Sequence, residues 1–441
     1  MFLKSFLLIV HLLWMSEAVF AITTLQSYEI YQRDDQYRVR GRVDLQEHFA
    51  SPEADRAIQY ALDTISSGGE LYLHSGTYLL RRQITLPSYV TLRGSGSGSV
   101  LQPSEDHDTG TVLLGRDANR TIISDLSIRG DHARAKVGIQ LDHCGDCQVE
   151  DVLVVGMQQH GIVLSDDSFL CEIRGAKVAD SGVSGILLKE LDRGGRGGDY
   201  VPNLVTNCIV YGGQKGIECD KALVANIVGC QVYQTEGYGF HLHNGSNSVL
   251  LSGCRTYQIS NDAVVVESSH EINISSNIFC WHTGHGLVLR NALWGTITGN
   301  NIIDNGSINL ANPQEDSLIV TGDRPFIKAP KEGQEISHYH GILIENESKG
   351  LTISSNAIFN WPVVPAMQYG IYEDSTCFSN LITANNINFC QEGDILSRGD
   401  STQVIGNVSY VAEPHYSKAS KKYQSFDTRL LDQFIEELKK F

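Results

Sequence analysis

Long apolar segments are almost absent from this sequence of 441 residues. After the first 21 residues no stretch is apolar enough to span a bilayer, so no membrane span is expected. Basic residues are also scarce, because 34 Lys and Arg face 51 Asp and Glu and leave a net charge of −17. A surface this acidic repels phosphate backbones, so no nucleic acid partner is expected. It argues more weakly against polyanionic glycans, since basic residues at a site can override the overall charge.

Metal-binding cysteine clusters are missing as well. The pair Cys144 and Cys147 has no second Cys or His pair beside it, so a zinc site is not expected. Most of the cysteines lie in strand positions at regular intervals, which is typical of buried, unpaired thiols that act as small apolar groups. Cys144 and Cys147, at a turn, are the one pair for which the sequence does not decide between a disulfide bond and free thiols. We expect neither a metal ion nor an organic cofactor.

A short phrase of Gly, aliphatic, any residue and aliphatic recurs along most of the chain. The phrase begins at Gly138, Gly161, Gly185, Gly216, Gly239, Ala263, Gly286, Gly341 and Gly370. Most steps between these starts are 23 or 24 residues, and a few are longer. A repeat this short, rich in Gly, Val, Ile and Asn, predicts an all-β solenoid: a parallel β-helix with two or three short strands per coil.

A second ladder has the same period, because another strand of each coil ends at a cysteine or an asparagine. These residues are Cys208, Cys230, Cys254, Asn277, Asn300, Asn356 and Asn385. Stacked coils place equivalent residues ~4.8 Å apart, so buried Asn amides can form hydrogen bonds along the column. We interpret this column as structural and its thiols as reduced.

The start of the chain carries a targeting pattern. Residues 1–21 have one early positive charge, a short apolar core and small residues at their end. This pattern is typical of a secretory signal peptide and predicts a protein secreted to the extracellular space or the periplasm.

The remaining residues predict one elongated domain with capped ends. Residues 22–426 form the predicted β-helix, in which Ser51-Pro52-Glu53 begins an N-terminal capping helix and Glu70 begins the first strand. Residues 427–441 form a predicted C-terminal helix that covers the other end. The sequence leaves a homo-oligomer open.

The candidate site lies on the outward side chains of the repeated phrase. Strand side chains alternate, so the third and fifth positions point outward while the second and fourth fill the core. The candidate catalytic residues are Glu218, Asp220 and Glu267. The candidate substrate-binding residues are Lys189, His241, His243 and Arg290 on the same stripe, Asp192, Arg193, Arg196 and Asp199 in an Arg-rich insert, and Tyr238, Trp281, His282 and His285 in turns beside it. Histidines, carboxylates, an arginine and aromatics on one face predict a working site.

The spacing of the carboxylates suggests acid–base chemistry. Carboxylates one coil apart do not both ionise easily, so one is expected to have a raised pKa and act as an acid. Asp220 and Glu267 are two coils apart, ~9–10 Å between backbones, and inverting glycoside hydrolysis needs carboxyl groups ~6.5–9.5 Å apart. A lyase or epimerase would instead need a base, an acid and a cation for a uronic carboxylate, which Lys189, His243 and Arg290 could supply.

The chain also resembles the pectin-lyase-like superfamily of right-handed parallel β-helices over nearly its whole length. The segments Ala57–Ala61, Gly68–Leu73, Gly76–Tyr78 and Val90–Gly94 are similar to the opening of pectate lyase and rhamnogalacturonase-like members. The resemblance implies the fold but no single reaction, because the superfamily holds hydrolases, lyases, epimerases, fructotransferases and phage tailspikes.

Two members of this superfamily resemble particular segments. The coil order is similar to that of inulin fructotransferase, which implies a catalytic role for Glu218, although Asn207 stands where that family has a catalytic Asp. Tyr238–His243 is similar to the Tyr-Gly-Phe-Asp-Pro-His motif of periplasmic mannuronan epimerases. His243 matches that family's His, whereas His241 replaces its Asp, and its Arg on the next coil would fall near Glu267 and is missing.

We therefore predict a secreted carbohydrate-active enzyme that cleaves or transfers a glycosidic bond of a polysaccharide or oligosaccharide through carboxylate acid and base residues. The first alternative is a polysaccharide lyase or epimerase that acts on a uronate polymer. The second is a non-catalytic glycan-binding solenoid. An unsaturated product would favour a lyase, and exposed aromatics without convergent acids would favour binding alone.

Overall fold

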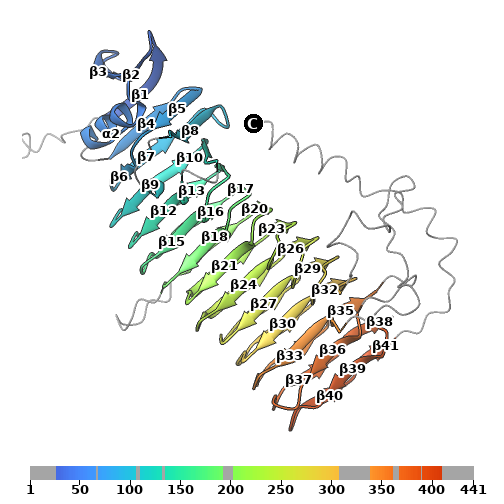
Figure 1. Cartoon of the computed structure of the whole chain (residues 1–441). Coiled ribbons are helices and arrows are strands. Elements are labelled where there is room, and N and C mark those ends of the chain that lie inside the picture. The colour runs from blue at the N-terminus through green and yellow to red at the C-terminus, as the bar shows by residue number, and fades with distance from the viewer. Residues whose placement is uncertain are drawn as a thin grey trace, which may run out of the picture.

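The computed structural model describes residues 26–65, 68–105, 110–131, 135–191, 202–306, 338–360, 367–388 and 390–409. They form an elongated solenoid whose strands stack in order along its axis (Figure 1). Each regular coil gives one short parallel strand to each of three sheets, so the predicted parallel β-helix is confirmed with three strands per coil. The predicted signal peptide and C-terminal helix lie outside the described residues.

The three sheets have the following strands, given in chain order. Sheet A contains β1 (Gln26–Arg33), β2 (Gln36–Gly41), β3 (Glu47–Ser51), β4 (Gly69–Leu73), β7 (Val90–Arg93), β10 (Ile122–Ser124), β13 (Gln148–Glu150), β16 (Glu172–Arg174), β19 (Asn203–Thr206), β22 (Leu223–Val228), β25 (Asn247–Ser252), β28 (Asn273–Ser275), β31 (Thr296–Thr298), β34 (Thr352–Ser354), β37 (Leu381–Thr383) and β40 (Gln403–Ile405). Sheet B contains β5 (Gly76–Leu80), β8 (Ser99–Pro103), β11 (Ser127–Arg129), β14 (Leu153–Val155), β17 (Lys177–Ala179), β20 (Ile209–Tyr211), β23 (Gln231–Tyr233), β26 (Arg255–Tyr257), β29 (Ile278–Cys280), β32 (Asn301–Ile303), β35 (Ala357–Phe359), β38 (Asn386–Asn388) and β41 (Val408–Ser409). Sheet C contains β6 (Ile84–Leu86), β9 (Thr111–Arg116), β12 (Val137–Asp142), β15 (His160–Ser165), β18 (Ser184–Lys189), β21 (Lys215–Asp220), β24 (Phe240–His243), β27 (Val264–Glu267), β30 (Leu287–Arg290), β33 (Ile342–Glu345), β36 (Tyr369–Glu373) and β39 (Gly393–Ser397).

The repeated phrase forms the strands of sheet C, stacked in register. Ile162 pairs with Ile186, which pairs with Ile217, and all three side chains are buried between the sheets. The glycine at the start of the phrase lies at the corner where sheet B meets sheet C. A Cβ at Gly216 would lie 2.3 Å from Cγ1 of Val232. The phrase begins with glycine on most coils because this corner has little room for a side chain, and Ala263 places only a methyl group there.

The predicted column of Cys and Asn is confirmed as an interior feature. Asn277, Asn300, Asn356 and Asn385 are buried, and each side-chain amide donates to the Oδ1 of the asparagine that follows it in the column at 2.9 Å. Asn407 continues the column by one coil and is its last member in the described part of the chain. All ten cysteines are free, and the thiols of Cys208, Cys230 and Cys254 donate to backbone carbonyls.

The N-terminal cap is confirmed, with two differences from the prediction. Helix α2 (Ala54–Thr64) begins after Glu53, and the hydroxyl of Ser51 accepts the Glu53 backbone N–H at 3.0 Å instead of capping the helix. The prediction that Glu70 begins the first strand is wrong, because β1 to β3 precede it and form an antiparallel extension of sheet A. These strands lack the repeated phrase. Within the described residues, no helix is long and apolar enough to cross a membrane.

Candidate active site

Sheet C presents two columns of outward side chains, as the alternation of strand side chains predicts. The third-position column runs from Leu187 through Glu218 and His241 to Val265, one residue per coil. In the fifth-position column, Lys189 pairs with Asp220, and Asp220 pairs with His243. Three predicted residues from different coils, Glu218, His241 and His243, thereby meet in one cluster.

Glu218 is the centre of this cluster and is only 5% exposed. Its carboxylate accepts hydrogen bonds from the Lys215 ammonium and the Ser184 hydroxyl, and Nε2 of His243 lies 2.9 Å from Oε1. Burial of the carboxylate raises its pKa, but these partners and the nearby His241 lower it more, so the pKa of Glu218 lies far below its ordinary value. The carboxylate of Glu218 is therefore ionised near neutral pH, so it is not the carboxyl with the raised pKa that the spacing led us to expect.

His241 lies between Glu218 and the next coil and is 8% exposed. Its ring stacks on that of His243, with centroids 4.0 Å apart and planes 10° apart, and the Tyr238 ring lies 4.9 Å away. Neither ring nitrogen of His241 has a hydrogen-bond partner. Burial lowers the pKa of His241 below its ordinary value, although Glu218 partly opposes this. The ring is therefore a neutral imidazole near neutral pH.

The other two predicted catalytic carboxylates flank the histidine pair. Oδ1 of Asp220 accepts a hydrogen bond from Nδ2 of Asn244 at 2.7 Å and lies 3.9 Å from Nδ1 of His243. Oε2 of Glu267 lies 3.8 Å from Nε2 of His241, on a side chain that is about half exposed. Glu267 is therefore the solvent-facing group of the cluster, and Asp220 lies beside His243 while its hydrogen bond goes to Asn244.

The remaining predicted residues are only partly brought to this cluster. Lys189 lies one coil earlier and pairs with Glu190, and Arg290 forms an ion pair with Glu345. Asp192, Arg193, Arg196 and Asp199 lie outside the described residues.

Two residues of the turn after β29 do not lie on the outward face of sheet C. The prediction that His282 binds substrate is wrong, because its side chain is fully buried and its two ring nitrogens contact Thr256 and the backbone of Ile259. Trp281 follows sheet B and donates from Nε1 to Asp304 at 3.2 Å.

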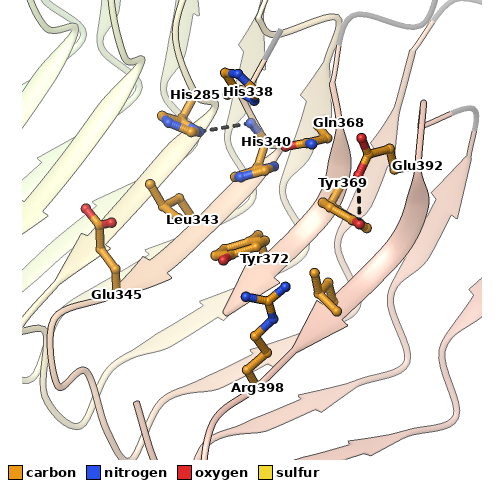
Figure 2. Close-up of a pocket in the computed structure, with 11 residues that line it drawn as sticks. His285, His338, His340, Leu343, Glu345, Gln368, Tyr369, Tyr372, Glu392 and Arg398 are labelled. Carbon is orange, nitrogen blue, oxygen red and sulfur yellow. Dashed lines mark hydrogen bonds between the residues drawn. The ribbon is translucent and has the colours of Figure 1, made fainter. Parts of the chain in front are cut away.

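A second region of interest lies farther along the same face of sheet C. It is an open pocket with a volume of about 410 Å³ (Figure 2). The pocket is lined by His285, His338, His340, Leu343, Glu345, Gln368, Tyr369, Tyr372, Glu392, Leu396 and Arg398. Of these, only His285 was predicted to bind substrate.

The residue just before the first position of the phrase, which is Gly or Ala263, gives a sequence signal for part of both regions. On successive coils this position holds Lys215, Tyr238, Asp262, His285, His340 and Tyr369. Strict alternation assigns the position to the interior, but the strand turns at the glycine corner and the side chain points outward. The Lys215 contact with Glu218 shows this orientation.

The cluster offers ligand atoms that could hold a metal ion. One atom each from Glu218, His241 and His243 lies within 4.8 Å of the others. The Lys215 ammonium already contacts the Glu218 oxygen that faces both histidines, and this cation would repel a divalent metal. We therefore infer that Lys215, and not a metal ion, is the cation that pairs with Glu218.

Comparisons with known proteins agree with this architecture. A family model described as a right handed beta helix region matches residues 160–323. A search of curated proteins finds no match. Among solved structures, the A-module of mannuronan C-5 epimerase AlgE6 from Azotobacter vinelandii has a TM-score of 0.66 and 17% identity, over 82% of this chain and 96% of that chain.

Two further structures have lower scores. The periplasmic alginate epimerase AlgG has a TM-score of 0.54 and 12% identity, over 76% of this chain and 78% of that one. The catalytic unit of a GH87 alpha-1,3-glucanase from Streptomyces thermodiastaticus has a TM-score of 0.51 and 12% identity, over 82% and 68%. The protein is a right-handed parallel β-helix with the pectin-lyase-like fold, as the resemblance implied.

Proposed function

We propose that this protein acts on a uronic-acid polysaccharide and removes the proton from the sugar carbon that bears the carboxylate. The resulting carbanion then either takes a proton on its opposite face, which gives epimerisation, or expels the glycosidic oxygen at carbon 4, which breaks the chain by β-elimination. The observation that carries this proposal is His241, a buried neutral imidazole with two unpartnered ring nitrogens on the outward face. A group of this kind is suited to accept a proton near neutral pH.

The neighbours of His241 supply the other parts of such a reaction. A carbon next to a carboxylate becomes acidic only when the negative charge is stabilised. The Lys215 ammonium, which pairs with Glu218, is close enough to His241 to lower its pKa and could take part in this stabilisation. Tyr238 lies beside His241 and carries a phenol that could return a proton to the sugar. Glu218 and His243 fix the position of His241 through stacking and their mutual contact at 2.9 Å.

The comparisons support a polysaccharide substrate. Two of the similar structures are described as alginate or mannuronan epimerases, and another as a glucanase. Their identities are 17% or lower, so the choice of a uronate depends on the His241 cluster and not on likeness.

Glycoside hydrolysis is the second candidate, and one observation favours it. Asp262, one coil after Tyr238, is a buried carboxyl whose pKa is raised by burial to about 6. A carboxyl of this kind can donate a proton to a leaving group near neutral pH. Its Oδ1 already accepts the His285 backbone N–H at 2.7 Å, so it has one oxygen left for this task.

The test is incubation of the purified protein with polymannuronate in deuterated water, followed by NMR and ultraviolet absorbance. An epimerase places deuterium on carbon 5 with inverted configuration, and a lyase gives an unsaturated, ultraviolet-absorbing end. A hydrolase gives new reducing ends with neither change. Polymer that is cleaved without deuterium incorporation or unsaturation would contradict the proposal and favour Asp262. We also propose that the protein is exported, which N-terminal sequencing of the mature chain would test.

A further inference from the structure

The pocket of Figure 2 lies in line with the His241 cluster. Tyr372 belongs to the same outward column of sheet C as His241, four coil steps farther along. Four steps correspond to ~19 Å along the solenoid axis. The residues between them, Val265, Val288 and Leu343, pack into one apolar row that Tyr238 and Tyr372 also contact. A continuous column thus joins the cluster to the pocket.

The floor of the pocket is a row of flat polar groups. The rings of His340 and Tyr372 stack with centroids 4.7 Å apart and planes 5° apart, and the Arg398 guanidinium lies 5.8 Å from the Tyr372 centroid (Figure 2). His340 is 5% exposed, and its Nδ1 is buried without a hydrogen-bond partner. An unpartnered buried nitrogen beside an open pocket is suited to a hydroxyl of a bound ligand.

The two sides of this pocket carry opposite charges, from Arg398 and Glu392. Most arginines in the described part of the chain pair with a carboxylate, as Arg290 does with Glu345, but Arg398 has no ion pair there. Its contact with Tyr372 holds the guanidinium in place for a two-pronged bond to a carboxylate. Glu392 lies on the other side of the pocket, where Tyr369 donates to it at 2.9 Å (Figure 2). A ligand carboxylate is thus attracted to the Arg398 side and repelled from the Glu392 side.

We propose that this pocket is a distal subsite that binds a uronate residue of the same polysaccharide, with the sugar carboxylate on Arg398 and hydroxyls on His340 and Glu392. The identity of the sugar rests on the proposed function. The glycan chain then lies parallel to the solenoid axis and spans four coils, roughly one sugar unit per coil. The subsite selects long, acidic chains over short or neutral ones.

The test is calorimetric titration of oligomannuronates of increasing length at constant ionic strength. The protein carries His241→Asn, so that no substrate is converted. Arg398→Gln is added to this background, and Arg82→Gln is the matched control, because Arg82 is another exposed arginine without an ion pair in the described part of the chain. We expect affinity to rise once an oligomer is long enough to reach the pocket. Arg398→Gln should weaken binding of these long oligomers by about 10- to 100-fold, and Arg82→Gln should not.

Several results would overturn the subsite. They are an equal loss of affinity for disaccharides, no loss for long oligomers, or the same loss for oligomers whose carboxylates have been reduced to alcohols. The two proposals fail separately, because this titration needs no turnover. If binding depends on Arg398 but the parent protein, with His241 intact, does not convert the polymer, the subsite is kept and the proposed reaction is rejected. Conversion without any effect of Arg398→Gln would do the opposite.

Discussion

The interior Asn column and the outward His241 cluster are both polar, but they satisfy their polar atoms in opposite ways. Each buried asparagine of the column bonds to the next coil, so the repeat itself provides every partner. The cluster has no such repeat along its column, and both nitrogens of His241 remain unpartnered. A polar group that the fold satisfies is structural, whereas a buried polar group left open on an accessible face is available for a ligand.

The largest effect that would sharpen this comparison is expected from His241→Asn. Loss of the proposed base should lower turnover of a uronate polymer by ~10²–10⁴-fold. The buried ring stacks on His243, so the melting temperature should also fall, but the fold should be retained. His143→Asn, at an exposed histidine after β12, is the control. Steady-state kinetics measures the turnover, and thermal unfolding measures the melting temperature. Near-native turnover of the His241 variant would remove the cluster from catalysis.

Asn300→Leu is expected to change mainly the stability of the protein. The substitution leaves the Ile274 carbonyl and the Asn277 backbone N–H without their bonds to the Asn300 amide. Two buried groups without partners should cost about 3 kcal/mol or more in free energy of unfolding. Asn301→Leu, at the exposed neighbour, should cost far less. Urea unfolding measures the difference, and equal losses in both variants would show that the column is not what stabilises the coil.

Titration separates the two regions further, because only the cluster ionises. The pKa of Glu218 is lowered in the folded protein, so its stabilising contribution is present above the unfolded carboxyl pKa of about 4.3 and is lost as the pH falls below it. Glu218→Gln should lower the free energy of unfolding by about 1–3 kcal/mol at neutral pH, and parent and variant should converge in acid. A difference that stays constant with pH would contradict the assigned ion pairs.

Cys254→Asn is expected to have the smallest effect. The adjacent coil has Asn277 in the same column, and its Oδ1 accepts the Cys254 backbone N–H at 2.8 Å. An asparagine at position 254 would extend this pattern, so the free energy of unfolding should change by less than about 1 kcal/mol. Cys254→Leu tests whether the position accepts a larger side chain. If the Asn and Leu variants lose the same free energy of unfolding, the interpretation is contradicted.

The sequence predicts the fold well because both ladders repeat, and a period can be read without knowing any contact. Glu218, His241 and His243 were found for the same reason, since register and alternation place them together. The errors occur where the repeat breaks. His282 lies in a turn whose side chain folds inward, and Lys215 lies at a glycine corner where strict alternation fails.

The distal pocket was missed for a different physical reason. His340 lies 55 residues after His285 although the two are neighbours in space, because residues 307–337 intervene. Arg398 lies outside the phrase-bearing coils altogether. Sequence spacing therefore did not reveal the contact of Arg398 with Tyr372, which comes only from the stacking of complete coils.

The most direct test of the account is a crystal structure of the His241→Asn variant with a bound oligomannuronate. The account predicts density along the outward face of sheet C, parallel to the solenoid axis, with one sugar beside Tyr238 and another whose carboxylate contacts Arg398. An oligosaccharide bound on sheet A or sheet B, or across the coils at some other place, would contradict the assignment of this face as the working surface.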